Sequence, residues 1–175
     1  SLIRYRRRPG GPLEELSVPL PGRAQAENAV LALLATSALL PDVPTETLKR
    51  GISAAHIPGR FERVAASPDI VLDGAHTPDS IRALIAAFEE RYPSRPIVIF
   101  GCGESKRYPE MSALLGPWAH RIVLSRPGTF KRSNMPALYE RVKVHAPQAE
   151  LVEDPAPALR RAIELAGRER PVLVT

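Results

Sequence analysis

The stretch IVLDGAHTPDS at residues 70–80 decides the fold of this 175-residue chain. Three apolar residues run into an acid and a glycine, and a short polar turn follows them. Apolar residues then recur at i, i+3, i+4 and i+7 over 81–88, with Pro78 placed where a helix tolerates proline, in its first turn. The pattern therefore predicts a strand, a loop and a helix in succession.

The loop in this stretch is the first candidate for a functional site. In an α/β sheet, ligands bind beyond the carboxyl ends of the strands, and a helix N-terminus beside them favours anionic groups. Four polar side chains fall in the loop, namely Asp73, His76, Thr77 and Asp79. A purely structural alternative is that Thr77 and Asp79 cap the helix and that Asp73 satisfies a turn.

The rest of the C-terminal part alternates between apolar runs and helical patterns. Strands are expected at 61–65, 70–72, 97–100, 122–124, 151–152 and 172–174, and helices at 78–91, 108–117, 134–144 and 155–167. Continuous apolar runs suit strands buried on both faces. The alternation predicts an α/β fold with a doubly wound, mostly parallel sheet.

The N-terminal part has a different pattern. Extended segments at 1–5 and 15–20 predict a hairpin or the edge of a sheet, and helices are expected at 23–40 and 45–55. The turn at 57–60 marks a boundary, which gives two domains, 1–56 and 57–175. The chain starts without Met and ends in an apolar run, so we expect a piece of a longer protein, truncated within its second domain.

Composition restricts the possible function. The chain is 44% hydrophobic and 25% charged, with a net charge of +5 that permits anionic ligands. Arginines at positions 4 and 6–8 lack the interleaved aromatics of a nucleic-acid platform, so no nucleic acid is expected. Cys102, the single cysteine, excludes an internal disulfide and favours a cytoplasmic location. No apolar run approaches the roughly 20 residues of a membrane span.

Three further stretches carry candidate residues. FGCGESKR at 100–107 combines two glycines with Lys106 and Arg107, which could hold a phosphate or carboxylate. Ser125 follows the next strand, and GRAQAENA at 22–29 places Gln25 and Asn28 on one helix face. Each stretch also has a structural alternative, a glycine-rich strand exit or an ordinary helix start. No phosphate-binding P-loop and no metal-ligand spacing is present.

Together and in this order, these stretches resemble the Mur ligase superfamily, in particular its folylpolyglutamate synthase/dihydrofolate synthase branch. GRAQAENA resembles the branch's GxHQxxNA, PGRFE at 58–62 its PGR-hydrophobic-E, and LDGAHTP at 72–78 its DGAHNP. The chain departs from the branch at Ala24, Thr77 and Ser105, where His, Asn and Asp are usual. Thr77-Pro78-Asp79 is also similar to the DYAHTPD motif of muramyl-tripeptide synthetases.

The resemblance implies an ATP-dependent ligase that adds L-glutamate to a folate through an acyl phosphate. Residues 1–56 would be the end of the ATP-binding central domain and 57–175 a Rossmann-like C-terminal domain. ATP, Mg²⁺, folate and L-glutamate would be its small-molecule partners, with metal ligands mostly in the N-terminal part that this chain lacks. A monomer, inactive as this piece alone, is expected. The alternatives are a muramyl-peptide ligase and a non-catalytic nucleotide-binding module.

The resemblance also implies roles for eight residues at matched positions. Those expected to bind ATP are Gln25, Asn28, Arg60, Asp73 and His76. Of these, Arg60 and His76 are also expected to be catalytic, since both would lie near the phosphates. Those expected to hold the incoming amino acid are Thr77, Lys106 and Ser125.

Overall fold

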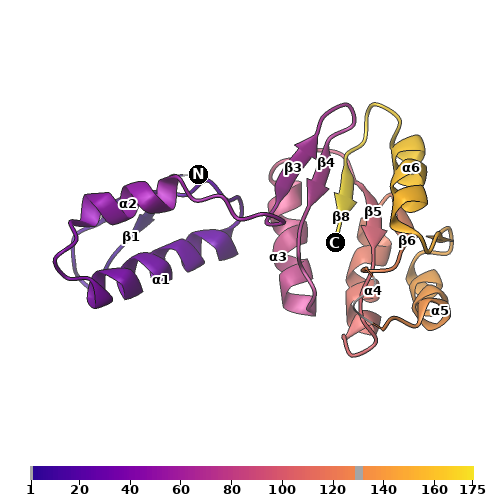
Figure 1. Ribbon diagram of the computed structural model, residues 1–175, viewed down its shortest axis with the longest axis horizontal. Coiled ribbons are helices and arrows are strands. Elements are labelled where there is room, and N and C mark those ends of the chain that lie inside the picture. Colours follow the sequence, from indigo (N-terminus) through magenta and orange to yellow (C-terminus); the bar gives the residue numbers. More distant parts are fainter. Residues whose placement is uncertain (1, 129–131) are drawn as a thin grey trace. The chain divides into compact units, whose positions relative to one another are not determined.

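The computed structural model describes residues 2–128 and 132–175, so Ser1 of the predicted first strand lies outside the described residues. The chain divides into two compact units, Ser1–Pro58 and Gly59–Thr175, called unit 1 and unit 2 below (Figure 1). Within the described residues, no helix has both the length and the apolar character needed to cross a membrane.

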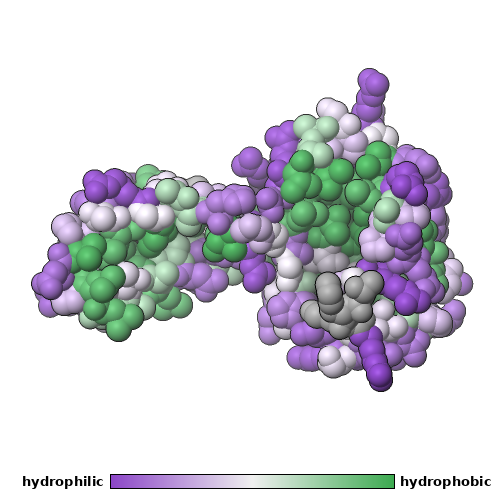
Figure 2. Space-filling model, in the orientation of Figure 1, coloured by the Kyte–Doolittle hydropathy of each residue, from purple (hydrophilic) through white to green (hydrophobic). Residues whose placement is uncertain are grey.

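Unit 1 is a hairpin covered by two helices. Its elements are the antiparallel strands β1 (Leu2–Tyr5) and β2 (Glu14–Ser17) and the helices α1 (Arg23–Leu39) and α2 (Thr45–Ser53). Leu16 and Leu33 are buried in its small core, whereas Leu31 and Leu39 of α1 are 63% and 79% exposed. Hydrophobic surface is accordingly visible on this unit in Figure 2.

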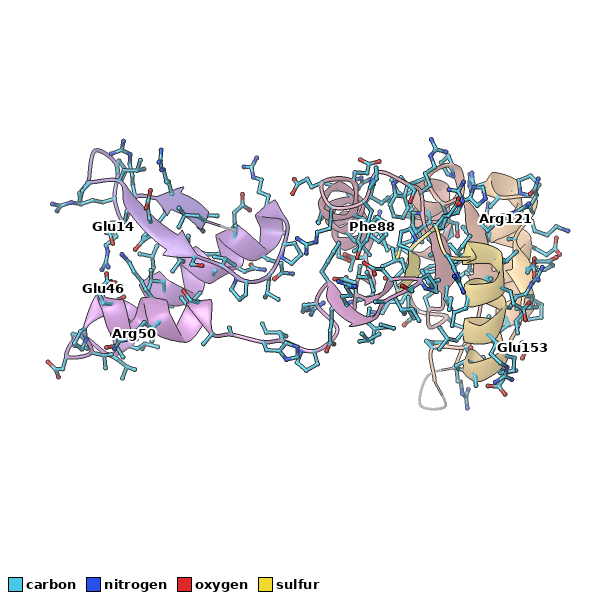
Figure 3. The ribbon with its side chains drawn as sticks, turned by 90° about the horizontal axis from the view of Figure 1, so that it is seen from above. Glu14, Glu46, Arg50, Phe88, Arg121 and Glu153 are labelled. Carbon is cyan, nitrogen blue, oxygen red and sulfur yellow. The ribbon has the colours of Figure 1, made fainter. Side chains whose placement is uncertain are left out.

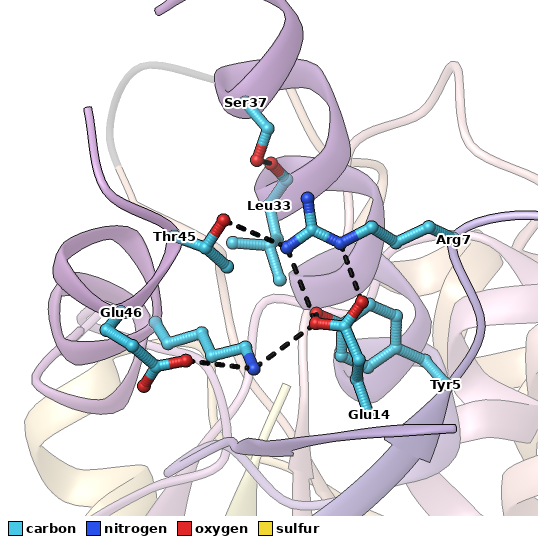
Figure 4. A network of polar contacts seen from close by, with 8 residues as sticks. Tyr5, Arg7, Glu14, Leu33, Ser37, Thr45 and Glu46 are labelled. Carbon is cyan, nitrogen blue, oxygen red and sulfur yellow. Dashed lines mark hydrogen bonds and ion pairs between the residues drawn. The ribbon is translucent and has the colours of Figure 1, made fainter. Parts of the chain in front are cut away.

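A polar network ties the hairpin to α2 (Figure 4). The Glu14 carboxylate accepts hydrogen bonds from Arg7 Nε at 2.7 Å and Tyr5 Oη at 2.8 Å, and Lys49 Nζ lies 3.3 Å away. Arg7 also donates to Thr45 Oγ1 at 3.0 Å. The bond from Arg7 is the main reason why the pKa of Glu14 falls to about 2.

Unit 2 is a six-stranded sheet with helices on both faces. Its strands are β3 (Glu62–Ala65), β4 (Ile70–Leu72), β5 (Ile97–Phe100), β6 (Arg121–Leu124), β7 (Glu150–Leu151) and β8 (Val172–Val174), in the spatial order β3-β4-β8-β5-β6-β7. All neighbours are parallel except β3 and β4. The predicted α/β fold with a doubly wound, mostly parallel sheet is confirmed.

Two apolar layers hold the helices of unit 2 to the sheet. Helices α3 (Pro78–Glu89), α4 (Tyr108–Trp118) and α5 (Met135–His145) pack on one face, and α6 (Pro155–Ala166) packs on the other. Phe88 of α3, labelled in Figure 3, is 1% exposed and meets Trp118 of α4 edge-on, with ring centroids 5.5 Å apart.

The predicted elements are present, with four strands shifted at their ends, among them β6, which starts at Arg121 rather than at 122. The strand predicted at 61–65 starts at Glu62, because Phe61 has a φ of 48° and cannot continue an extended backbone. The second hairpin strand covers Glu14–Ser17 rather than 15–20, and β7 covers Glu150–Leu151 rather than 151–152. The helices end within two residues of their predicted ends.

Gly101 is required where β5 leaves the sheet. A Cβ at this position would lie 2.4 Å from the carbonyl oxygen of Ser125. Gly101→Ala is therefore expected to destabilise unit 2 by about 2 kcal/mol, because the backbone must shift where β5 or β6 ends. Urea denaturation followed by Trp118 fluorescence measures this change. Gly51→Ala, with nothing within 4 Å of its Cβ, should leave the Trp118 transition unmoved; equal effects of the two variants would contradict the packing argument.

The Glu14 network should make unit 1 sensitive to acid. The folded-state pKa of about 2 lies below the ordinary 4.5, so the network's contribution is complete above pH 4.5 and is lost as the pH falls toward 2. Thermal unfolding followed by circular dichroism should show that Glu14→Gln loses less stability between pH 5 and pH 3 than the unsubstituted chain does. Glu15→Gln is the control, because its ion pair with Arg4 is more than half exposed.

Candidate functional site

The carboxyl ends of neighbouring strands bring three of the predicted stretches to one edge of the unit 2 sheet. The Asp73 N–H donates to Val174 O at 3.0 Å, and the Gly101 N–H donates to Thr175 O at 3.1 Å. The Ser125 N–H donates to Phe100 O at 3.1 Å. The loops that follow β4, β5 and β6 therefore lie along a single edge, where α/β sheets bind their ligands.

A tight turn before β3 is joined to the loop after β4. Asp73 Oδ2 accepts the Phe61 N–H at 2.9 Å, and Asp73 Oδ1 accepts the Ala75 N–H at 2.8 Å. The Gly74 N–H donates to Gly59 O at 2.8 Å. Gly59 and Phe61 have φ values of 67° and 48°, so left-handed residues flank Arg60 on both sides.

This turn places Arg60 directly over the loop. A Cβ on Gly74 would lie 3.1 Å from Arg60 Nη1, so the glycine leaves room for the guanidinium. His76 is exposed, and its Nδ1 lies 2.8 Å from Gly74 O. The structure thus brings Arg60, Asp73 and His76 together beside the N-terminus of α3, an arrangement suited to anionic groups.

The environment of the Asp73 carboxyl has opposing effects on its pKa. Burial is the largest effect and raises the pKa. The two backbone N–H groups and the charge of Arg60 act in the other direction. Because the hydrogen bonds are made to both oxygens, this carboxylate organises the loop.

Thr77 is the N-cap of α3, as the structural alternative predicted. Its Oγ1 accepts the Ser80 N–H at 3.2 Å, and Ser80 Oγ accepts the Thr77 N–H at 2.9 Å, which completes a capping box. Asp79 is not the cap; it pairs with Arg82 at 2.6 Å. A role for Thr77 in holding an amino acid stays a prediction.

The other two residues predicted to hold the incoming amino acid differ in how accessible their side chains are. Ser125 is 3% exposed, and its hydroxyl donates to Glu153 O at 3.2 Å. Lys106 is half-buried beside Cys102, whose thiol has a pKa raised by burial to about 11 and therefore stays protonated at neutral pH. Lys106 is thus the more available of the two predicted contacts.

Gln25 and Asn28 lie in unit 1, so the residues predicted to bind ATP are divided between the two units. They stand three positions apart on α1, with Gln25 half-buried and Asn28 exposed. Within the described residues, no group of three His, Cys, Asp or Glu side chains could hold a metal ion.

Sequence reasoning missed the role of Glu62. Its Oε2 accepts the Gly59 N–H at 2.8 Å and so braces the turn that carries Arg60. The signal was the spacing in PGRFE, where an acid three positions after a glycine can accept its N–H in a turn.

Comparisons with known proteins agree with this geometry. Residues 59–175 match the protein family described as "Mur ligase, glutamate ligase domain". The chain is 32% identical over 162 residues to the probable bifunctional folylpolyglutamate synthase/dihydropteroate synthase of Haloferax volcanii, which covers 91% of this chain and 19% of that protein. It is 34% identical over 183 residues to the UDP-N-acetylmuramyl-tripeptide synthetase of Leifsonia xyli subsp. xyli. That match covers 94% of this chain and 35% of the synthetase.

Solved structures show the same fold. Escherichia coli FolC in complex with DHPP and ADP has a TM-score of 0.77 at 25% identity, covering 94% of this chain and 38% of that chain. Folylpolyglutamate synthase of Mycobacterium tuberculosis complexed with ADP and AMPPCP has a TM-score of 0.81 at 22% identity, covering 99% of this chain and 44% of that chain. This chain spans 19% and 35% of the length of the two curated relatives.

Asp73→Asn should loosen the turn that carries Arg60. An amide has only one acceptor oxygen, so one of the Phe61 and Ala75 N–H groups loses its partner, at a cost of about 1 to 3 kcal/mol. Hydrogen exchange at these two amides should become faster. Asp79→Asn is the control, because its side chain is 90% exposed and an exposed pair contributes no more than about 1 kcal/mol. Unchanged exchange in Asp73→Asn would show that Asp73 does not hold the turn.

Proposed function

This chain belongs to the Mur ligase family, whose glutamate ligase domain it carries at residues 59–175, and we propose that it is the C-terminal part of an ATP-dependent ligase that joins L-glutamate to a folate. Residues 1–56 would then be the end of the ATP-binding central domain, and 57–175 the C-terminal domain. A cytoplasmic, monomeric enzyme that acts on small molecules is part of the proposal.

One observation carries it. Arg60 is fixed over Gly74, beside Asp73 and His76, at the sheet edge where nucleotides bind in α/β folds. The chemistry of these side chains fits ATP. A guanidinium and an imidazole suit its phosphates. Each Asp73 oxygen accepts one backbone N–H and has capacity for a second donor, such as a ribose hydroxyl.

In the proposed reaction, an oxygen of the folate carboxylate bonds to the γ-phosphorus of ATP, giving an acyl phosphate and ADP. The glutamate amine then attacks the acyl carbon, so an amide forms, phosphate leaves and the amine gives up a proton. Phosphoryl transfer depends mainly on positioning and on neutralising charge. Arg60 would supply positive charge to the phosphates, and both Arg60 and His76 would supply hydrogen bonds.

The remaining predicted residues fit around this centre. Asn28 and Gln25 would bind the nucleotide from unit 1, with Asn28 at the adenine. Lys106 would hold the carboxylate of the incoming amino acid, together with Thr77 and Ser125 at the same sheet edge. Mg²⁺ would accompany ATP, held mainly by residues N-terminal to this chain.

A second candidate, a muramyl-peptide ligase, has an observation of its own in its favour. The muramyl-tripeptide synthetase of Leifsonia xyli subsp. xyli is 34% identical to this chain over 183 residues. Thr77-Pro78-Asp79 follows the pattern of those enzymes more closely than that of the folate branch. The two candidates share ATP and the acyl phosphate and differ in the acceptor.

Arg60→Ala in the full-length ligase should lower turnover by at least about tenfold, because a cation near the transferred phosphoryl group would be lost. ATP-dependent phosphate release, measured with a folate acceptor and separately with a muramyl-peptide acceptor, tests both the residue and the substrate. Arg82→Ala, which removes an exposed cation paired with Asp79, should leave turnover unchanged.

Activity with the muramyl-peptide acceptor alone would replace the folate assignment. Absence of activity with both acceptors would support a non-catalytic nucleotide-binding module. Full activity of Arg60→Ala would show that Arg60 has no role in the reaction.

A further inference from the structure

Positive charge gathers at the opposite edge of the unit 2 sheet, where the parallel strands begin. Arg170 and Arg95 stand two residues before β8 and β5, while His120 and Arg121 lie at the start of β6. The register aligns the first residues of these three neighbouring strands. Because adjacent strands are about 4.8 Å apart, the four side chains form a row roughly 10 Å long, called the basic edge below.

Hydrogen bonds to backbone carbonyl groups fix the basic edge. Arg95 Nη1 donates to Pro117 O at 3.0 Å, and Arg170 Nη1 donates to Arg95 O at 3.4 Å. The His120 N–H donates to Pro96 O at 2.9 Å. Each of these two guanidiniums uses one of its five N–H donors in these bonds. The Arg95 and Arg170 side chains are therefore held in place with donors remaining for a ligand.

The positive charges of the basic edge form no ion pair with the described carboxylates, although the charge of Arg121 contributes to the lowered pKa of Glu150. Among residues 2–128 and 132–175, no carboxylate forms an ion pair with its four members. Burial, followed by the charges of Arg170, Arg121 and Arg95, lowers the pKa of His120. His120 therefore lies in a positive electrostatic field.

Acidic residues on the surrounding elements form ion pairs or hydrogen bonds with residues outside the basic edge. Asp69 pairs with Arg63 at 3.0 Å, and Glu150 pairs with Arg161 at 2.7 Å. Glu89 accepts a hydrogen bond from Trp118 Nε1 at 3.1 Å. Glu169 stands between Arg168 and Arg170 in the sequence, so the segment that precedes β8 still carries net positive charge.

A pocket of about 230 Å³ opens beside His120 and Arg121. His145 and Gln148 also line it, so four residues with polar side chains surround one space. Among the described residues that line it there is no Phe, Tyr or Trp on which a nucleic-acid base could stack. Both the pocket and the short row suit a compact anion.

We propose that the basic edge, formed by Arg95, His120, Arg121 and Arg170, binds an oligophosphate, a small anion with two or three linked phosphate groups. The row is long enough for two or three phosphates and too short for the extended tract of phosphates that a duplex presents. The site is separate from the one proposed for ATP, because it lies at the amino ends of the strands rather than at their carboxyl ends.

Titration of the 175-residue chain with sodium tripolyphosphate, followed by amide chemical shifts, tests this proposal. Shifts at Ile97, His120, Arg121 and Val172 are expected, and they should weaken as salt is added. Arg121→Gln should weaken the affinity by about tenfold, since a charged hydrogen bond is lost. Arg82→Gln removes the same charge from the exposed pair with Asp79 and should leave the affinity unchanged.

His120→Gln is the second variant if Arg121→Gln does not fold, and it too should weaken binding. No shift at the basic edge at millimolar tripolyphosphate, or equal weakening by Arg82→Gln, would overturn the proposal. Shifts confined to Asp73–His76 would place the anion at the carboxyl edge and overturn it as well. Tighter binding of a short DNA duplex, at equal phosphate concentration, would assign the edge to nucleic acid instead.

Discussion

The backbone hydrogen bonds of β8 hold unit 2 together. This strand lies between β4 and β5, so the two strands that lead into the candidate site are joined through it rather than to each other. Leu173 at its centre is fully buried. Thr175 continues the same pattern: its carbonyl accepts the Gly101 N–H, and its hydroxyl donates to Ala75 O at 3.1 Å. The last residues of the chain thus fix the distance between the loop after β4 and the loop after β5.

A second constraint acts at the turn around Arg60. A residue other than glycine with a positive φ costs about 1 kcal/mol or more, and Phe61 adopts one. Its N–H is bound by Asp73, and its ring packs 5.9 Å from that of Phe88, so the surrounding structure stabilises the unusual backbone. The Asp73 carboxylate therefore holds the turn that carries Arg60. The site is part of the fold rather than an addition to it.

The two edges of the sheet differ in their chemistry because all strands except β3 run in the same direction. At the carboxyl edge, a capped helix N-terminus, glycines and Arg60 surround a loop. At the amino edge, α4 ends and presents backbone carbonyls, one of which is bound by Arg95. Arg95 satisfies a carbonyl at this helix end, Arg170 satisfies the carbonyl of Arg95, and the remaining donors of both give the edge the capacity to bind anions.

The sequence by itself determined the local elements and the layers. The helical spacing after residue 80 predicted α3, and Ile81, Leu84 and Phe88 are indeed buried. The apolar run at 97–100 predicted a strand buried on both faces, which β5 is. Resemblance of short motifs predicted the family, which the match over residues 59–175 confirmed. Such features depend on residues close together in the chain, so periodicity and spacing reveal them.

Only the tertiary structure decided how these elements combine. The place of β8 between β4 and β5 depends on pairing between residues about 75 to 100 positions apart, for which no local pattern exists. The antiparallel β3, the left-handed Phe61 and the position of Arg60 over Gly74 likewise depend on contacts between separate segments. For Thr77 the sequence allowed a cap, and the helix geometry shows that it is one, while its contact with an amino acid stays a prediction. A hydrogen bond forms only where both partners are brought together in space, and the chain order does not contain that information.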